Sequence, residues 1–324
     1  MKRDIHITNI HIMSNTSLEH NLSTCANCGK GEETSINLKS CAACKSVKYC
    51  SRDCQVAHRP QHKKECKKRA KELYVEKLFE QPPMDDDDED CPICMIRLPS
   101  LESGSVYMNC CGKVICRGCV FAFQSRAILA ERVEEDNICP FCRTPPPSTG
   151  KEMIRRMEKR MEVNDAEAFH SMGIYFITGA HGLQQNYVKA LEFYHKAAEL
   201  GDAKSYAEIG NAYEIGRGVE RDRKKAKHYY ELAAMEGDAC SRHNLGAIEG
   251  IAGNTDRALR HYMIAVKYGV SNSLEGIKRM YKCGQVTRDD YAKTLKFYQV
   301  YLDEIKSDQR DLAAKCFPDS HKYY

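Results

Sequence analysis

The spacing of the cysteines constrains this chain more than any other feature of its sequence. Fifteen of the 18 cysteines lie between Cys25 and Cys142, all at spacings typical of metal ligands. Two thiolates separated by two residues can bind one metal ion, because the tight turn between them directs both sulfurs to the same side. Structural zinc takes four such ligands in a tetrahedron, so eight ligands make two sites. The sequence therefore predicts small modules that fold around zinc rather than around a large apolar core.

Residues 91–143 contain four cysteine pairs, three with two intervening residues and one with none. In chain order they are Cys91 and Cys94, Cys110 and Cys111, Cys116 and Cys119, and Cys139 and Cys142. The stretch resembles a RING finger, the cross-braced zinc module of many ubiquitin ligases. In that family the first and third pairs bind one zinc ion, and the second and fourth pairs bind the other. The resemblance thus implies two zinc sites of four cysteines each.

The RING resemblance departs from the family pattern at one ligand. RING fingers often read Cys-Gly-His where this chain reads Cys111, Gly112 and Lys113. A lysine ammonium is not a usual zinc ligand, so the fourth ligand of that site must come from elsewhere. The neighbouring Cys110 can supply the missing sulfur, which makes this stretch an all-cysteine variant of the finger.

Residues 25–66 contain a second set of eight candidate ligands. They are Cys25, Cys28, Cys41, Cys44, Cys50, Cys54, His62 and Cys66. The last two pairs have three intervening residues, which places both members on one face of a helix. The stretch resembles a MYND finger, whose interleaving implies one site of Cys25, Cys28, Cys50 and Cys54 and another of Cys41, Cys44, His62 and Cys66. His58 is the alternative to His62, but only His62 stands four residues before Cys66.

MYND fingers are peptide-binding modules, and several of them bind proline-rich ligands. Their groove typically uses a glutamine, present here as Gln55, and a tryptophan where this chain has Arg59. An arginine at that position could recognise an acidic peptide. The alternative interpretation is a zinc-stabilised structural unit that binds no ligand of its own.

An internal repeat begins after residue 151. The order Ala-x2-aromatic-Tyr-x2-Ala-Ala-x2-Gly occurs at Ala190–Gly201 and again at Ala226–Gly237. A third copy runs from Ala258 to Gly269, and a degenerate copy lies at Thr294–Leu302. A second glycine follows an apolar residue in three copies, at Gly173, Gly210 and Gly246. Small residues at helical spacing let two helices approach closely, while the tyrosines fill the seams between repeats.

The spacing of these copies resembles Sel-1-like repeats, a branch of the tetratricopeptide superfamily, and includes the turn Gly216–Val219. The closing glycine of each copy, or Asn164 in the first, can take the left-handed conformation that ends a helix. The resemblance covers about residues 151–305. It implies an all-α solenoid that presents a concave surface to partner proteins.

The expected fold is therefore multidomain, with two small α+β zinc fingers followed by an all-α helical-repeat solenoid. The boundaries are 1–24 for a disordered tail, 25–66 for the MYND finger, 67–90 for a basic helix and an acidic linker, 91–143 for the RING finger, 144–150 for a Pro-rich linker, 151–305 for the repeats and 306–324 for a C-terminal tail. Pro82 and Pro83 are expected to stop the basic helix. The acidic run Asp85–Asp90 repels itself and predicts a flexible spacer. We expect the fingers and the repeats to fold independently.

The formal net charge of +4 counts the thiols as neutral, whereas zinc binds thiolates. Four zinc ions on fifteen cysteines and one histidine lower the charge by about 7, to roughly −3. Binding to nucleic acid therefore loses its main support. No apolar run approaches membrane-spanning length, and the N-terminus lacks the apolar core of a signal peptide. The sequence thus predicts a chain that is not secreted, in the reducing cytoplasm or nucleus and without a membrane partner.

The RING resemblance implies that the chain binds a ubiquitin-conjugating enzyme and positions its thioester-linked ubiquitin for transfer. In the family three contacts matter: an aliphatic residue in the first CxxC, a proline in the last, and a cation after the final ligand. The matching residues are Ile93, Pro140 and Arg143. No residue is predicted to form a covalent intermediate. The alternative is a non-catalytic scaffold in which both fingers and the repeats only bind proteins.

Overall fold

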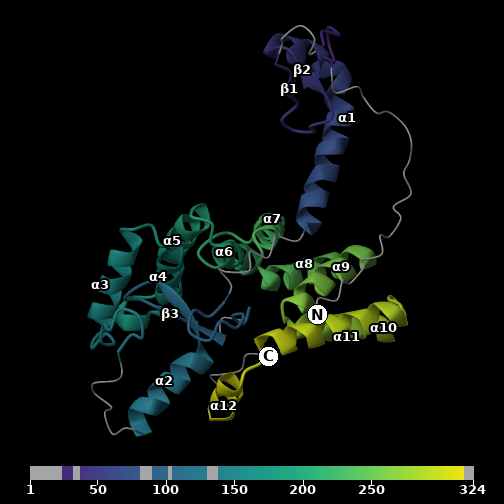
Figure 1. Ribbon diagram of the computed structural model, residues 1–324. Coiled ribbons are helices and arrows are strands. Elements are labelled where there is room, and N and C mark those ends of the chain that lie inside the picture. The colour runs from purple at the N-terminus through teal and green to yellow at the C-terminus, as the bar shows by residue number, and fades with distance from the viewer. Residues whose placement is uncertain (1–23, 32–36, 81–89, 101–103, 130–137, 317–324) are drawn as a thin grey trace. The chain divides into compact units, whose positions relative to one another are not determined.

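A computed structural model describes residues 24–31, 37–80, 90–100, 104–129 and 138–316 (Figure 1). The expected tail before Thr24, the two prolines at 82 and 83, and the acidic run up to residue 89 lie outside the described residues. The chain divides into two compact units, residues 1–77 and residues 78–324.

The first unit consists of a small sheet and one long helix. Strands β1 (Lys39–Ser40) and β2 (Lys48–Tyr49) pair antiparallel, and helix α1 (Arg52–Phe79) follows. The last two residues of α1 belong to the second unit. The buried core of the finger is Leu38, Val47 and Tyr49 with the cysteines Cys25, Cys41 and Cys44. Because only three of these side chains are not candidate ligands, the finger has little apolar burial to stabilise it without metal.

The second unit opens with another small module. Strands β3 (Ser105–Met108) and β4 (Lys113–Cys116) form an antiparallel hairpin, and helix α2 (Arg117–Leu129) follows directly. The register pairs Ser105 with Cys116 and Met108 with Lys113. Gly112 closes the hairpin loop with a φ of 75°, and its N–H donates to the Met108 carbonyl at 2.8 Å. The loop therefore places Cys110 and Cys111 at the tip of the hairpin.

Four of the CxxC turns in the two modules close in the same way. The N–H of the residue after the second cysteine donates to the carbonyl of the first cysteine, over 2.8 to 3.0 Å. These closing residues, all with positive φ, are Gly29, Lys45, Met95 and Arg143. A left-handed conformation costs a residue with a Cβ about 1–2 kcal/mol. Three of the four turns are thus held against the local preference of the chain, which is consistent with an external constraint such as a shared metal ion.

The remainder of the second unit is helical. Its elements are α3 (Gly150–Met161), α4 (Ala166–Thr178), the short helix η3 (Ala180–Gly182), α5 (Tyr187–Glu199), α6 (Ala203–Ile215), α7 (Arg223–Met235), α8 (Ala239–Ile251), α9 (Thr255–Lys267), α10 (Ser271–Lys282), α11 (Arg288–Ile305) and α12 (Asp308–Cys316). Consecutive helices from α4 to α9 pack on one another in a solenoid. In the described part of the chain, no helix combines the length and the apolar character needed to cross a membrane.

The glycines inside the repeat helices are packing positions. A Cβ on Gly173 would lie 2.4 Å from the Tyr194 ring, and a Cβ on Gly210 would lie 2.7 Å from the Tyr230 ring. The third copy repeats this contact between Gly246 and a buried tyrosine. Each tyrosine therefore fills the space that its glycine leaves open, as the sequence predicts.

The closing residues of the repeats also confirm the prediction. Gly201, Gly237 and Gly269 have φ values of 95°, 100° and 84°, and Asn164 has a φ of 56°. After Gly201 and Gly237 an aspartate caps the next helix: the Asp202 carboxylate accepts the Ser205 N–H at 2.7 Å, and the Asp238 carboxylate accepts the Ser241 N–H at 2.5 Å. After Gly269 the first residue of the turn is Val270, which makes no such side-chain bond.

The structure differs from the predicted boundaries on both sides of the repeats. The sequence predicts a tail over residues 306–324, whereas Asp308–Cys316 form helix α12, which packs against α2. The Pro-rich linker is held in place, because Arg156 Nη1 donates to the Pro145 carbonyl at 2.8 Å. The sequence predicts separate domains for the second finger and the repeats, whereas both lie in one compact unit, residues 78–324.

The contact of Gly210 with Tyr230 predicts a difference between two otherwise identical substitutions. Gly210→Ala should destabilise the repeats by about 1–3 kcal/mol, because the added methyl overpacks against the ring. Gly250→Ala is the matched control, since its Cβ meets nothing closer than 3.8 Å. This control should gain about 0.5–1 kcal/mol from the lower backbone entropy of the unfolded chain. Urea denaturation followed by circular dichroism measures both; equal stabilities would contradict the packing role.

Candidate metal centres

The described residues contain four clusters of cysteine and histidine whose candidate ligand atoms all lie within 4.8 Å of one another. The clusters are Cys25, Cys28, Cys50 and Cys54; Cys41, Cys44, His62 and Cys66; Cys91, Cys94, Cys116 and Cys119; and Cys110, Cys111, Cys139 and Cys142. These are the four sets that the two resemblances imply. In both fingers, pairs one and three meet, and pairs two and four meet.

The spacing of the sulfurs fits a tetrahedral metal ion. Sγ of Cys28 lies 3.5 Å from Sγ of Cys50, and Sγ of Cys94 lies 3.8 Å from Sγ of Cys116. A tetrahedron with zinc–sulfur bonds of about 2.3 Å has an edge of about 3.8 Å. A disulfide would hold its sulfurs at about 2.05 Å. The cysteines are therefore arranged to share an ion and not to pair with one another.

The geometry distinguishes the two candidate histidines of the first finger. His62 Nε2 lies 3.1 Å from Cys44 Sγ, inside the cluster. His58 stacks on His62, with ring centroids 5.7 Å apart, and its Nδ1 lies 3.1 Å from the Tyr49 hydroxyl. His58 therefore lies outside the cluster and supports the orientation of His62.

The adjacent cysteines of the second finger both reach one cluster. Sγ of Cys111 lies 3.7 Å from Sγ of Cys139. Neither Cys110 nor Cys111 is among the residues with positive φ, because Gly112 takes the left-handed position of the loop. Lys113, which replaces the usual histidine, is exposed at the start of β4. The hairpin thus accommodates two adjacent ligands without backbone strain at either cysteine.

Local hydrogen bonds favour the thiolate form of one cysteine in the second finger, Cys91. The Cys116 side chain and backbone N–H lower the pKa of Cys91 to about 4, even though burial opposes this shift. The Cys116 N–H donates to Cys91 Sγ at 3.3 Å. Burial and the neighbouring thiolates of the first finger raise the pKa of Tyr49 to about 12. Burial raises the pKa of Cys110 and of Cys66, so these thiols need a bound cation to ionise at neutral pH.

Arg310, which lies near the C-terminal end of the described chain, contacts the cluster formed by Cys91, Cys94, Cys116 and Cys119. Arg310 of α12 is 1% exposed. Its Nη1 donates to the carbonyls of Arg97 and Ile305, each at 2.7 Å, and its Nη2 donates to the Ile96 carbonyl at 3.1 Å. Nη2 also lies 3.9 Å from Cys94 Sγ. Because four thiolates around a divalent ion carry a net charge of about −2, this buried cation offsets part of that charge.

The same face of the finger has further contacts with the last two helices. A Cβ on Gly118 would lie 2.8 Å from the Arg310 backbone nitrogen, so α12 approaches the finger at a glycine. Arg97 forms an ion pair with Glu304 at 2.8 Å. The Tyr301 hydroxyl accepts the Ser100 N–H at 3.2 Å. Sequence reasoning missed this interface, because no local spacing links residues 190 or more positions apart.

The opposite side of the finger contacts the first helices of the solenoid. The Tyr107 hydroxyl of β3 donates to Asp165 Oδ2 at 2.7 Å, and Arg160 Nε donates to the same oxygen at 2.8 Å. A Cβ on Gly112 would collide with the Arg160 guanidinium at 2.2 Å. The second finger is therefore held by helices from both ends of the repeat array.

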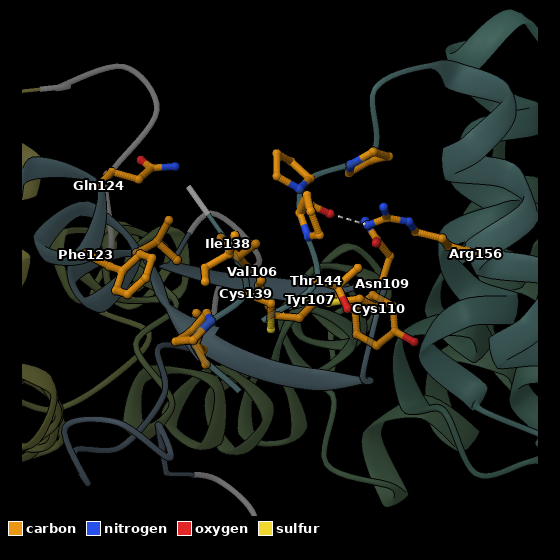
Figure 2. A pocket seen from close by; sticks show the side chains of 17 residues that line it. Val106, Tyr107, Asn109, Cys110, Phe123, Gln124, Ile138, Cys139, Thr144 and Arg156 are labelled. Atoms are coloured by element: carbon orange, nitrogen blue, oxygen red, sulfur yellow. Dashed lines mark hydrogen bonds between the residues drawn. The ribbon is translucent and has the colours of Figure 1, made fainter. Parts of the chain in front are cut away.

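A pocket of about 220 Å³ lies beside the cluster Cys110–Cys142 (Figure 2). Its apolar lining comes from Val106 of β3, Phe123 of α2, and Ile138 and Pro140. Phe123 was not a predicted site residue, although its place on the helix after Cys119 could have indicated one. The segment 145–147 closes the other side.

The remaining predicted partner-binding residues lie at the surface. Ile93 is 43% exposed and does not line the pocket, so it is not brought together with Pro140 there. Arg143 is exposed in the left-handed position that closes the last CxxC turn. Gln55 and Arg59 are both exposed on α1.

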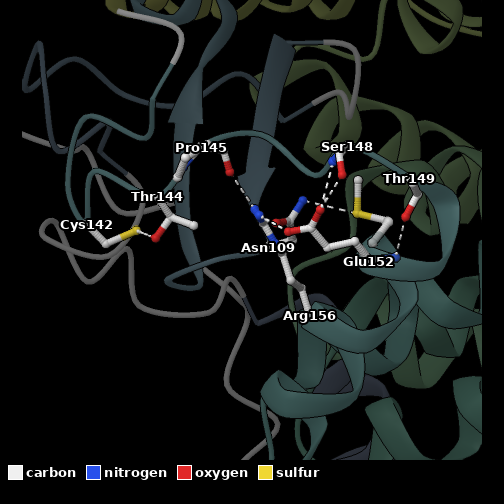
Figure 3. A network of polar contacts seen from close by, with 9 residues as sticks. Asn109, Cys142, Thr144, Pro145, Ser148, Thr149, Glu152 and Arg156 are labelled. Atoms are coloured by element: carbon white, nitrogen blue, oxygen red, sulfur yellow. Dashed lines mark hydrogen bonds and ion pairs between the residues drawn. The ribbon is translucent and has the colours of Figure 1, made fainter. Parts of the chain in front are cut away.

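A polar network attaches the end of the second finger to α3 (Figure 3). Glu152 accepts the Ser148 N–H at 2.8 Å and forms an ion pair with Arg156. The Ser148 N–H and the Arg156 guanidinium lower the pKa of Glu152 to about 2. The Thr149 hydroxyl caps α3 by accepting the Glu152 N–H at 3.1 Å. This network fixes the polypeptide between the finger and the first solenoid helix.

The fold and the clusters define a zinc-finger protein with helical repeats, and comparison with known families specifies two of its parts. Residues 25–66 match the MYND finger family. Residues 166–202 and 203–238, which correspond to α4–α5 and α6–α7, match the Sel1 repeat family. The chain therefore contains a MYND finger and Sel1 repeats, as the sequence predicts. The cysteine-rich module at 91–143 resembles a RING finger through the order of its cysteines.

Comparison with solved structures also finds matches to part of the chain. The Sel1 repeat protein from Oxalobacter formigenes is 25% identical, with a TM-score of 0.42, over 61% of this chain and 79% of that protein. A protective antigen of uropathogenic Escherichia coli with an SLR fold is 23% identical, with a TM-score of 0.41, over 52% of this chain and 37% of the antigen. No curated protein matches the chain.

Each cluster offers a metal ion four protein ligands, which is the arrangement of structural rather than catalytic zinc. The sequence predicts four zinc ions. The four clusters predict which cysteine substitutions lower the zinc content and which leave it unchanged. Cys110→Ser should lower the zinc content by about one ion per chain, because a hydroxyl is a poor zinc ligand. Cys240→Ser, at an exposed cysteine outside the clusters, should lose none. Elemental analysis of protein purified without chelator measures both. Full zinc content in Cys110→Ser would show that the site is completed otherwise.

The Arg310 contacts predict that metal in the second finger depends on α12. Arg310→Met keeps the length of the side chain but leaves the Arg97 and Ile96 carbonyls without their donor. The variant should release zinc to a chelator faster than wild type, and its fastest phase should correspond to about one ion. Lys315→Met, on an exposed position of the same helix, is the control. Identical release curves for the two variants would contradict the role of Arg310.

Proposed function

We propose that this protein is a RING-type ubiquitin ligase whose MYND finger and Sel1 repeats bind other proteins. The observation that carries the proposal is the interleaving of the four cysteine pairs in the second finger, together with an apolar pocket beside its second cluster. A ligase of this class forms no covalent intermediate. It binds a ubiquitin-conjugating enzyme and holds the thioester-linked ubiquitin in a reactive pose, so positioning is the catalysis.

The surface of the second finger offers apolar contacts for the conjugating enzyme. Phe123 and Pro140 line the pocket, and Ile93 is exposed in the first CxxC turn. Aromatic side chains are enriched in protein interfaces, and exposed aliphatic side chains add apolar area that a partner can bury. We infer that these three residues bind the conjugating enzyme whether or not it carries ubiquitin.

Arg143 has a different role in the proposal. Its position after the last ligand is fixed by the closed CxxC turn, and its side chain is exposed. The planar guanidinium can donate to two acceptors at once. We infer that Arg143 bridges the conjugating enzyme and its ubiquitin, and so orders the charged complex without recruiting the enzyme.

Single-turnover discharge of a ubiquitin-charged conjugating enzyme to free lysine tests the proposal without a substrate protein. Phe123→Ala and Ile93→Ala should weaken binding of the uncharged conjugating enzyme and slow discharge, each by about tenfold for a contact of 1.4 kcal/mol. Arg143→Ala should slow discharge while it leaves that binding nearly unchanged. Lys113→Ala, an exposed cation on the same finger outside the cluster, is the matched control. Zinc content must stay constant across all variants.

The alternative function is a scaffold that only binds proteins. It is favoured by the departure at Lys113, where the usual histidine ligand is missing. If wild type accelerates discharge with no member of a broad panel of conjugating enzymes, the scaffold replaces the ligase. If discharge is accelerated but Arg143→Ala behaves like Lys113→Ala, the ligase stands and the assigned role of Arg143 is wrong.

A further inference from the structure

A second buried arginine lies among the repeats, outside the metal clusters. Arg242 of α8 is 2% exposed. It donates to the Ala234 carbonyl at 2.8 Å, to the Leu78 carbonyl, and to the Glu80 carbonyl at 3.5 Å. Burial lowers the pKa of Arg242 to about 10, so the guanidinium keeps its charge at neutral pH. A buried cation without acceptors is costly, and two of these three acceptors come from the short segment Leu78–Glu80.

Leu78 fills an apolar site between repeat helices. Its side chain is fully buried against Ala226, Tyr230 and Ala234 of α7 and against Leu245 of α8. Leu78 belongs to the same compact unit as these helices but lies outside the repeats. The repeats therefore leave a leucine-sized space that their own sequence does not fill.

Phe79 occupies a second, cationic site beside the first. Its ring centroid lies 3.8 Å from Arg260 Cζ, 5.5 Å from Arg257 Cζ and 4.5 Å from the His261 ring centroid. Burial, with Arg242 and Arg257 nearby, lowers the pKa of His261 to about 3, so its ring is neutral. Cation–π contacts of this kind favour an aromatic side chain over an aliphatic one.

We propose that α7, α8 and α9 form a peptide-binding socket for a leucine followed by an aromatic residue, and that residues 78–80 occupy this socket in cis. The socket recognises three features of the segment that it binds. The space on α7 selects the leucine, the two arginines of α9 select the aromatic ring, and Arg242 selects a chain whose carbonyls are free. Free carbonyls occur at the C-terminal end of a helix, which is where Leu78 and Phe79 stand in α1.

The partner that fits is a protein segment with this Leu-aromatic pair at the end of a helix and an acidic residue after it. Glu80 holds the corresponding position in cis. Three arginines converge on the site, and Glu249, paired with Lys227 and Arg257, is the acidic group beside them. Such surroundings complement an acidic flank in the ligand. A partner segment must displace Leu78–Glu80, so binding in trans is coupled to release of the chain's own segment. This proposal does not depend on ligase activity.

Fluorescence anisotropy with the full chain tests the socket. The probe is a labelled peptide with the sequence of residues 69–80. The variant Leu78→Asp with Phe79→Ala vacates the site and should bind the probe at least about tenfold more tightly than wild type, in which the intramolecular segment competes. Adding Arg242→Met to the vacated variant should remove that gain. The same peptide carrying both segment substitutions is the control probe and should not bind.

Circular dichroism melting shows whether the vacated variant remains folded. If it does not, Phe79→Ala alone keeps Leu78 and the Arg242 bonds and should bind the probe with intermediate affinity. Equal binding of the probe by wild type and either folded variant would overturn the proposal, as would equal binding of the control probe. A wild-type dimer that dissociates when the probe is added would place a second copy in the socket and would also overturn the cis arrangement.

Discussion

Both fingers depend on the attraction between thiolates and a divalent cation, because the buried core inside each finger is small. The buried core of the MYND finger has three side chains besides its cysteines, and that of the second finger is Ile115 with three cysteines. Structural zinc contributes about 10–16 kcal/mol in small fingers, which is more than such cores can supply. Metal binding therefore stabilises the fold of each module, and the left-handed closures at Lys45, Met95 and Arg143 are local strain that such a constraint can hold.

Two buried arginines join the second unit in the same manner. Arg310 binds carbonyls of the second finger, and Arg242 binds carbonyls of the segment Leu78–Glu80. Each also donates to a carbonyl of its own helical array. A guanidinium has five donors in a fixed plane, so it can satisfy carbonyls from two chain segments at once. The two arginines thus hold two segments outside the repeats, the second finger and Leu78–Glu80, through main-chain carbonyls. These acceptors are present whatever side chains the segments carry.

The sequence predicted what local spacing determines. Cysteine pairs indicated the ligands, and the two family resemblances implied how the pairs interleave into four clusters. The recurring Ala, Tyr and Gly positions indicated the helix pairs, because that pattern repeats within a few turns of chain. It did not predict Arg310, α12 or the Leu78 socket. These contacts join residues that are 148 or more positions apart, from Leu78–Ala226 upward, and no periodicity connects an arginine to the carbonyls it will bind. The predicted tail beginning at residue 306 was wrong for the same reason. Helix α12 packs against α2 of the second finger, and no local pattern indicates that contact.

The position of Arg310 in the chain affects the order in which this protein assembles during synthesis. At 5–20 residues per second, the ribosome needs roughly 8 to 34 s to travel from Cys142 to Arg310. The second finger has all eight of its cysteines throughout that interval but lacks the cation that later covers one cluster. Its Gly118 face is meanwhile open to other molecules on the ribosome. The second finger is therefore synthesised well before the helix that packs on it. Until α12 is made, the nascent finger exposes the Gly118 face that α12 covers in the mature protein.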